Sequence, residues 1–125
     1  MKKILVLCVV LSLGIFGCGS ETSGNLSVSA PVQSGDYVKA TATYTPSSGS
    51  ALSGQEINFR WYTVGVTTKT KAPEILVTGF TNTSGVVISQ FLLPTVRSES
   101  VTVYVTASTG GLTNSEGWQT ITVAP

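Results

Sequence analysis

The sequence predicts an all-β protein that folds as a two-layer sandwich of about seven strands. From residue 26 onward, apolar and polar residues alternate with a period of two, and no segment has a convincing helical period. β-Branched residues are dense in this region, and turn residues interrupt the runs about every eight to twelve positions. These observations are typical of short antiparallel strands that bury one face each.

The first two strands are expected over residues 26–32 and 37–45. Pro31 lies near the end of the first strand, and because proline cannot donate a hydrogen bond to a ladder, it suits an edge position. The second strand alternates cleanly, and its predicted inward residues are Val38, Ala40, Ala42 and Tyr44.

Residues 57–63 and 101–107 form the third and sixth predicted strands. In the third strand Arg60 and Tyr62 are expected to face water, and the inward residues are Ile57, Phe59 and Trp61. In the sixth strand Tyr104 is expected to face outward, and the inward residues are Val101, Val103, Val105 and Ala107.

Residues 74–80 and 86–93 are the fourth and fifth predicted strands, separated by a tight turn at residues 81–85. Both faces of the 86–93 strand carry apolar residues, so alternation alone leaves its inward face open. The last strand covers residues 118–123, with Gln119, Ile121 and Val123 sharing one face. Trp118, at its start, either plugs the core or makes an exposed contact.

Seven short antiparallel strands at this spacing favour Greek-key connections and the immunoglobulin-like architecture, with Trp61 near the centre. Apolar residues occupy the positions where antibody domains carry their cysteine pair. A seven-strand closed barrel is the alternative architecture.

Three segments resemble bacterial Ig-like domains of the invasin and intimin type. Residues 51–59 (ALSGQEINF) are similar to the "pLsGvxVxF" stretch, residues 81–87 (TNTSGVV) to the "TdanGxa" turn, and residues 100–107 (SVTVYVTA) to the "xvtVtA" strand. The resemblance implies an Ig-like sandwich that acts as a rigid spacer in a surface protein. It also implies that the inward residues of the ambiguous strand are Val87, Ser89, Phe91 and Leu93.

The N-terminus predicts export. Lys2 and Lys3 precede a thirteen-residue apolar run that is too short to span a bilayer core of about 30 Å as a mature helix. The run ends in Ile15-Phe16-Gly17-Cys18, which resembles the lipobox of bacterial lipoproteins. The resemblance implies a signal peptide over residues 1–17 and a lipid on Cys18. A plain secretory signal and an uncleaved membrane anchor are the alternatives.

This organisation places a flexible tether at residues 18–25 and an Ig-like domain at residues 26–125. Gly19 differs from the aspartate that retains many lipoproteins at the inner membrane, so the outer membrane or the cell surface is the expected location.

Composition limits the partners of the mature chain. Removing residues 1–17 leaves 108 residues with five basic and six acidic side chains, and this balance argues against nucleic acid as a partner. The cysteines are Cys8, in the signal, and Cys18, so no disulfide is expected within the domain.

Catalysis is not expected. The chain has no histidine, which is the commonest general base near neutral pH and the commonest metal ligand. It has no phosphate-binding glycine loop, its carboxylates are scattered, and no cofactor or metal is predicted. Asp36, Glu56 and Glu99 lie near turns or strand ends and are candidate calcium ligands, but ordinary surface charge is the favoured interpretation.

Exposed aromatic residues are the main candidate contacts. Tyr62 and Tyr104 are expected on neighbouring strands with Arg60 nearby, either as a stabilising cross-strand pair or, together with Trp118, as a glycan or partner surface. A second candidate surface is the end of the sandwich away from the anchor, where residues 66–73 and 94–98 form loops. Its cations, Lys69, Lys71 and Arg97, are candidate partner contacts, and solubility of the loop is the plainer interpretation of the two lysines.

The sequence thus predicts a non-enzymatic, lipid-anchored Ig-like module of the bacterial cell envelope, attached to the membrane through Cys18. It is expected to act with a protein partner in adhesion or in assembly of a surface structure. A small carbohydrate-binding lipoprotein is the alternative.

Overall fold

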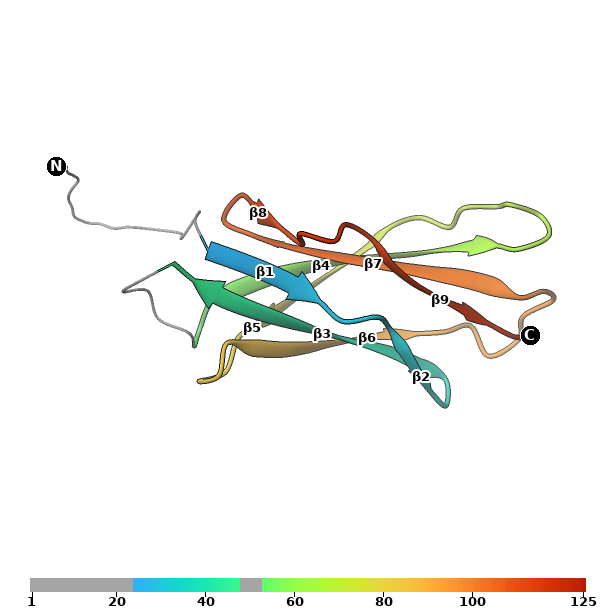
Figure 1. Cartoon of the computed structure of the whole chain (residues 1–125). Helices are drawn as coiled ribbons and strands as arrows, with labels where there is room; N and C mark the ends of the chain where they lie inside the picture. Colours follow the sequence, from blue (N-terminus) through green and yellow to red (C-terminus); the bar gives the residue numbers. More distant parts are fainter. Residues whose placement is uncertain (1–23, 48–52) are drawn as a thin grey trace, which may run out of the picture.

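The computed structural model describes residues 24–47 and 53–125, and within these ranges it contains strands and no helix, hence no helix able to cross a membrane. The first antiparallel sheet contains β1 (Gly24–Val28), β2 (Val32–Ser34), β3 (Tyr37–Pro46) and β6 (Val86–Leu92). The second contains β4 (Glu56–Gly65), β5 (Ile75–Phe80), β7 (Val101–Thr109), β8 (Leu112–Thr113) and β9 (Gln119–Val123). Two separate sheets confirm the predicted sandwich over the barrel alternative (Figure 1).

Eight of the nine strands correspond to the seven predicted ones, because the first predicted strand is interrupted and forms β1 and β2. β1 and β2 both pair with β3, but the five residues from Val28 to Val32 oppose only the four from Ala42 to Lys39. This extra residue is a β-bulge, and it coincides with Pro31. In the second sheet, β8 and β9 both pair with β7 and are separated by residues 114–118.

Several predicted boundaries need correction. β1 begins at Gly24, where Gly24 pairs with Pro46 and Asn25 with Thr45, so the predicted tether is too long by two residues. The rest of that tether, with Cys18 and the signal peptide, lies outside the described residues.

The structure also adds a strand that alternation did not reveal. β7 continues to Thr109 and turns directly into the short strand β8 through Gly110 and Gly111, both of which have positive φ angles (49° and 87°). A two-residue hairpin of this kind is a type I′ turn, which glycine adopts without strain.

The core lies between the sheets and contains the predicted inward residues of β3 and β4, all of them buried. In β6 and just after it, Ser89, Phe91 and Leu93 are buried and Val87 packs against the core, as the Ig-like resemblance implied. Ser89 is polar but has a partner: its Oγ accepts a hydrogen bond from Trp61 Nε1 at 2.9 Å. Val101 is only partly buried, because it lies at the end of β7.

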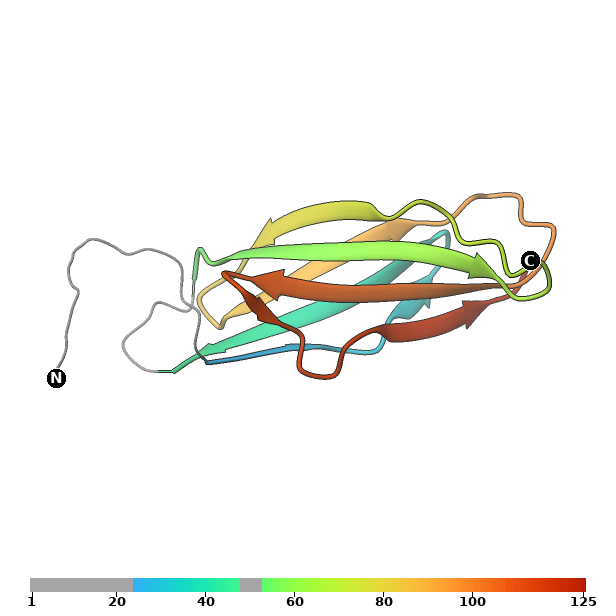
Figure 2. The ribbon, with the colours of Figure 1, turned by 90° about the horizontal axis from the view of Figure 1, so that it is seen from above.

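The sandwich is elongated, and its two ends differ (Figure 1). β1 begins at one end, whereas β9 ends at the other, beside the β4–β5 and β6–β7 loops. Figure 2 shows the same arrangement from above, with the strands running nearly along the long axis. Val66 N donates to Ser100 O at 2.9 Å, which joins the two loops directly. The two loops therefore share one end of the sandwich, as predicted, and the C-terminus lies beside them.

Candidate functional site

The outer face of the second sheet carries three aromatic side chains, Tyr62 of β4, Tyr104 of β7 and Trp118 just before β9, here called the aromatic cluster. Tyr62 and Tyr104 are directly opposite each other in the β4–β7 ladder. Their rings are parallel, at an angle of 5°, with centroids 4.6 Å apart. The predicted proximity of the two tyrosines is confirmed.

Trp118 completes the cluster from outside, so the interpretation of this residue as a core plug is wrong. Its ring meets Tyr62 edge-on, with centroids 4.9 Å apart, and 37% of the residue is exposed. The reason is the register of β9. Ile121 pairs with Val103, which is buried, so Ile121 and Val123 face inward. Trp118 is an odd number of residues away from both and therefore faces outward.

A turn over residues 114–117 positions Trp118. Asn114 is buried, and its Nδ2 and the Oγ1 of Thr106 both donate to the carbonyl oxygen of Gly117. Asn114 Oδ1 accepts from Glu116 N at 3.2 Å, and Gly117 has a φ of 75°, which favours glycine. Sequence reasoning missed this turn, although an asparagine followed three residues later by glycine is a recognisable turn signal.

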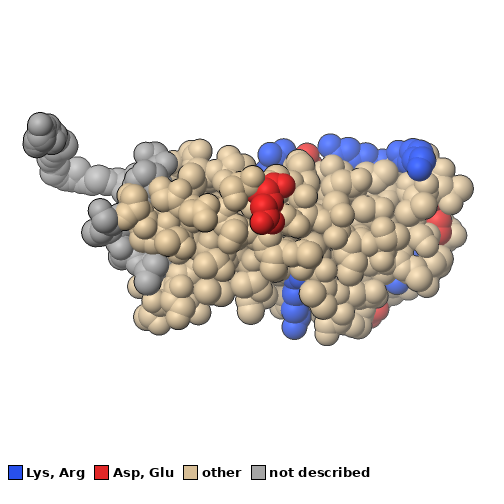
Figure 3. Space-filling model, viewed as in Figure 1, with Lys and Arg blue, Asp and Glu red and all other residues tan. Residues whose placement is uncertain are grey.

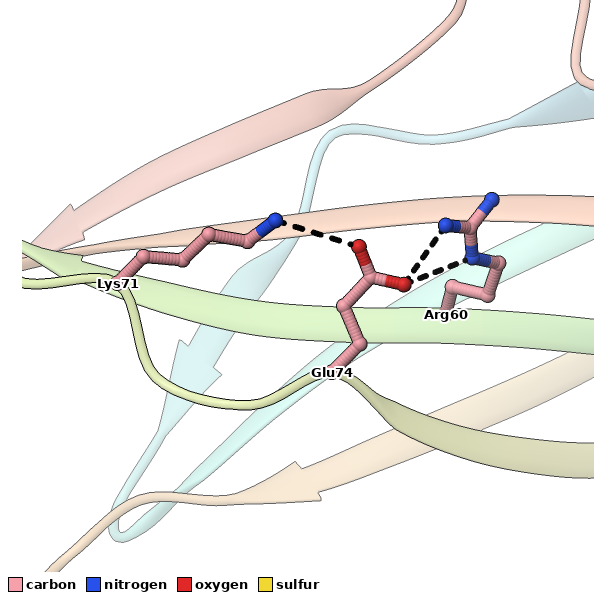
Figure 4. Close-up of polar contacts among 3 residues, drawn as sticks. All are labelled: Arg60, Lys71 and Glu74. Atoms are coloured by element: carbon pink, nitrogen blue, oxygen red, sulfur yellow. Dashed lines mark hydrogen bonds and ion pairs between the residues drawn. The ribbon is translucent and has the colours of Figure 1, made fainter.

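Two cations cover the cluster. Arg60 lies over the Trp118 ring, with Cζ 5.4 Å from the centroid, and Lys71 Nζ lies 4.4 Å from the Tyr62 centroid. Glu74 lies between them (Figure 4): its Oε1 is 2.7 Å from Arg60 Nη2 and its Oε2 is 3.4 Å from Lys71 Nζ. The hydrogen bond from Arg60, more than that from Lys71, lowers the pKa of Glu74 below its usual 4.5.

The covered rings favour the cross-strand pair over a sugar platform. Tyr104 contacts Tyr62 from β7, on one side of β4. Lys71 contacts Tyr62 from the other side of β4, where an isolated backbone β-bridge pairs Lys71 with Val64. The Tyr62 ring is thus contacted by both a stacked ring and a cation, whereas stacking on a sugar needs an open ring face. As a cross-strand pair the tyrosines contribute about 0.2–1 kcal/mol to the sheet.

Glu99 fastens the β4–β5 loop to the β6–β7 loop. Its Oε1 accepts from the backbone N–H groups of Thr67 and Thr68 at 2.7 and 3.0 Å, and its Oε2 accepts from Thr68 Oγ1 at 2.6 Å. Gly65 lies against this contact, and a Cβ there would displace the Glu99 carboxylate and the Thr68 hydroxyl. The Thr68 hydroxyl, followed by the two backbone N–H groups, lowers the pKa of Glu99.

The three predicted loop cations have different roles. Arg97 donates from Nε to Ala124 O at 3.1 Å and from Nη1 to Pro94 O at 2.5 Å, so it holds the β6–β7 loop against the C-terminal segment. Lys71 belongs to the aromatic cluster. In the described part of the chain, Lys69 is the one of the three whose side chain makes no hydrogen bond, and it lies on a left-handed turn with a φ of 60°.

Acid is expected to loosen the Glu99 contact. Because the pKa of Glu99 is lower in the folded protein than in the unfolded chain, this contact stabilises the fold above about pH 4.5 and is lost as the pH falls through the folded value. Urea unfolding of wild type and Glu99→Gln should therefore differ at pH 7, and the difference should shrink toward pH 3. Glu56→Gln is the control, since the Glu56 carboxylate makes no hydrogen bond or ion pair within residues 24–47 and 53–125. A constant difference between wild type and Glu99→Gln at both pH values would contradict this prediction.

Charge is sparse elsewhere on the molecule. Most of the face seen in Figure 3 carries no charged side chain, and the basic atoms gather mainly along its upper edge. Among the described residues no three cysteine or acidic side chains come together as a metal site, and the candidate ligand Glu99 is already engaged with the loop. The arrangement offers two contact surfaces, the aromatic cluster and the end of the sandwich formed by the loops of residues 66–73 and 94–98, here called the loop end.

Comparison with protein-family models finds no match to the chain, and comparison with curated proteins also finds none.

Proposed function

We propose that this protein is a non-enzymatic, lipid-anchored module of the bacterial cell envelope, which presents a rigid sandwich for adhesion or for assembly of a surface structure. In this proposal residues 1–17 direct export and Cys18 carries the lipid. The anchored chain reaches the outer membrane or the cell surface, where the domain contacts a protein partner.

One observation carries the proposal: the elongated sandwich begins at one end and has its fastened loops at the other (Figure 1). A lipid on Cys18 would precede β1 by only a few residues, so the end of the sandwich where β1 begins would lie nearest the membrane. The loop end, where Glu99 and Arg97 hold the backbone, would then face outward. A preorganised loop end suits contact with a partner, because little ordering remains to be done on binding.

The strand order supports an Ig-like assignment. The first, second and fifth predicted strands, which are β1 with β2, β3 and β6, form the first sheet. The third, sixth and seventh, which are β4, β7 and β9, lie together in the second. Immunoglobulin domains divide the corresponding strands A, B and E from C, F and G in the same way. Here the fourth strand, β5, pairs with β4 of the second sheet.

The anchor is tested by replacing Cys18 in the full chain expressed in a bacterium. Wild type is expected in the membrane fraction, with a mass increase on the mature N-terminal cysteine equal to its acyl groups. Cys18→Ser is expected to leave that fraction and to keep the β-sheet circular dichroism of the wild type. Equal membrane retention of both forms, or an unmodified thiol at position 18, would contradict lipid anchoring.

The loop end is tested with Lys69→Gln, in a cell-adhesion assay and in an assay for assembly of surface structures. A clear loss in either assay is expected, and Lys39→Gln, on the exposed face of β3, is the control for removal of one surface charge. Unchanged behaviour of Lys69→Gln in both assays would contradict the role of the loop end. Quenching of tryptophan fluorescence by sugars, abolished by Tyr62→Ala, would instead support carbohydrate binding.

A further inference from the structure

The two open sides of the sandwich are protected to different degrees. On the side of β1, β2, β8 and β9, both edges are broken, one by the bulge at Pro31 and the other by the turn at residues 114–117. Ser115 N also donates to Leu26 O at 3.1 Å, which links the two sheets there. Interruptions of this kind keep a sheet edge from pairing with another chain.

The opposite side has no such protection. β5 pairs with β4 along one edge, and no strand in the described part of the chain pairs with its other edge. From Ile75 to Phe80, β5 has no charged residue, no proline and no bulge. Leu76 and Phe80 lie on its outer face, with 67% and 63% of each residue exposed. A regular, apolar and unpaired edge is a template for strand addition.

The sequence of β5 fits a second copy of itself. In an antiparallel pair centred on Thr78, Leu76 of each copy lies opposite Phe80 of the other, and Thr78 lies opposite Thr78. This two-fold register buries four exposed apolar side chains in two cross-strand pairs. Centring the pair on Val77 would instead place Leu76 against Thr78 and Phe80 against Glu74.

The charges beside β5 are compatible with the same register. On β4, Glu56 lies opposite Phe80 and Arg60 opposite Leu76. Across the two-fold axis each row of outer-face residues would run Glu56, Phe80, Leu76, Arg60, with opposite charges at its ends. Successive strands are about 4.8 Å apart, so these ends are about 14 Å apart, and Arg60 is already paired with Glu74. The row therefore contributes little attraction, but it places no like charges together.

β6, the other unprotected edge, is less suited to pairing with itself. A pair centred on Gln90 would put Lys39 of both copies in one row, since Lys39 lies opposite Gln90 in the β3–β6 ladder. A pair centred on Ser89 would set apolar Ile88 against Gln90. The Gln90 register also sets Ile88 against Leu92, but its central row carries a lysine at each end, whereas the central row of the β5 register is neutral.

We propose that two copies of this protein associate through antiparallel pairing of their β5 strands around Thr78, which joins the two second sheets into one continuous sheet. The partner is thus a second copy of this chain. The proposal rests on the regular edge of β5 and on the self-complementary order of its exposed apolar residues. It does not depend on the lipid anchor or on the adhesive role.

Disulfide trapping tests the register. Residues directly opposite in an antiparallel pair have Cα atoms about 4.5–5.5 Å apart, which a disulfide can span. The purified full chain carrying Thr78→Cys is expected to form a covalent dimer on oxidation in detergent, above the background of the wild-type chain. Gln90→Cys, at the centre of the β6 alternative, is the matched control and is expected to stay at background. Equal trapping of both variants, or none with Thr78→Cys, would overturn the proposal.

A substitution pair tests the energetics in the same detergent. Leu76→Lys and Ile88→Lys each place a lysine on the outer face of an exposed edge strand, at residues of similar exposure. Leu76→Lys is expected to weaken the dimer about tenfold or more in sedimentation experiments, because the pair would bury an ammonium group. Ile88→Lys should leave the dimer unchanged. A monomeric wild type, or equal weakening by both variants, would also overturn the proposal.

Discussion

Replacing Trp61 with alanine is expected to lower the free energy of unfolding by about 3–5 kcal/mol. Trp61 is fully buried at the centre of the core, and its ring stacks on Phe91 with centroids 5.3 Å apart. Alanine would leave a cavity between the sheets and remove the donor that satisfies Ser89. Because a small domain is stable by only about 5–15 kcal/mol, this loss is a large share of the total.

Denaturation with urea, followed by circular dichroism, measures this loss. Val96→Ala is the control, since Val96 is 89% exposed and its truncation should change stability by less than about 0.5 kcal/mol. Ser89→Ala separates the hydrogen bond from the packing, with an expected cost of about 1–3 kcal/mol for the unsatisfied indole N–H. Similar midpoints for Trp61→Ala and Val96→Ala would show that Trp61 is not central to the core.

The sandwich could be predicted from sequence because each strand buries one face, so apolar and polar residues alternate with a period of two. In β3, where small and apolar residues alternate with polar ones, the inward residues follow directly from this period. In β6 the period fails, because Ile88 and Leu92 are apolar and yet exposed on an unpaired edge. In β6 the resemblance to Ig-like domains predicted which residues face inward. The hydrogen bond from Trp61 to Ser89 explains why a serine is among them.

The interruption of the first strand and the presence of β8 were not predictable from alternation. A bulge shifts the pairing by one residue without changing composition, and only Pro31 marked its position. The three-residue strand β2 and the two-residue strand β8 are too short to show any period.

The candidate site was predictable where it depends on strand register and not where it depends on loops. Tyr62 and Tyr104 were placed together because neighbouring strands bring their outward residues side by side. Lys71 and Glu74 were not assigned to that cluster, since the loop between β4 and β5 has no period from which its path follows. The position of Trp118 likewise depends on the turn at residues 114–117.

Replacing Asn114 with alanine is expected to lower the free energy of unfolding by about 1–3 kcal/mol and to detach Trp118 from the tyrosines. Asn114 is only 4% exposed, and its side chain both donates to Gly117 O and accepts from Glu116 N. Alanine can make neither bond, so Glu116 N loses its partner and Gly117 O keeps only the bond from Thr106. Since Gly117 directly precedes Trp118, a loosened turn releases the indole from its edge-on contact with Tyr62.

Two measurements separate the stability effect from the effect on the aromatic cluster. Urea unfolding reports the loss of stability, and near-ultraviolet circular dichroism reports the order of the three outer rings under native conditions. Ser115→Ala is the matched control, because it alters an exposed residue in the same turn and should change neither measurement. If Asn114→Ala kept the wild-type near-ultraviolet spectrum, Trp118 would be held by Tyr62, Tyr104 and Arg60 rather than by the turn. The aromatic cluster would then order this part of the chain, which reverses the direction of dependence argued from the hydrogen bonds.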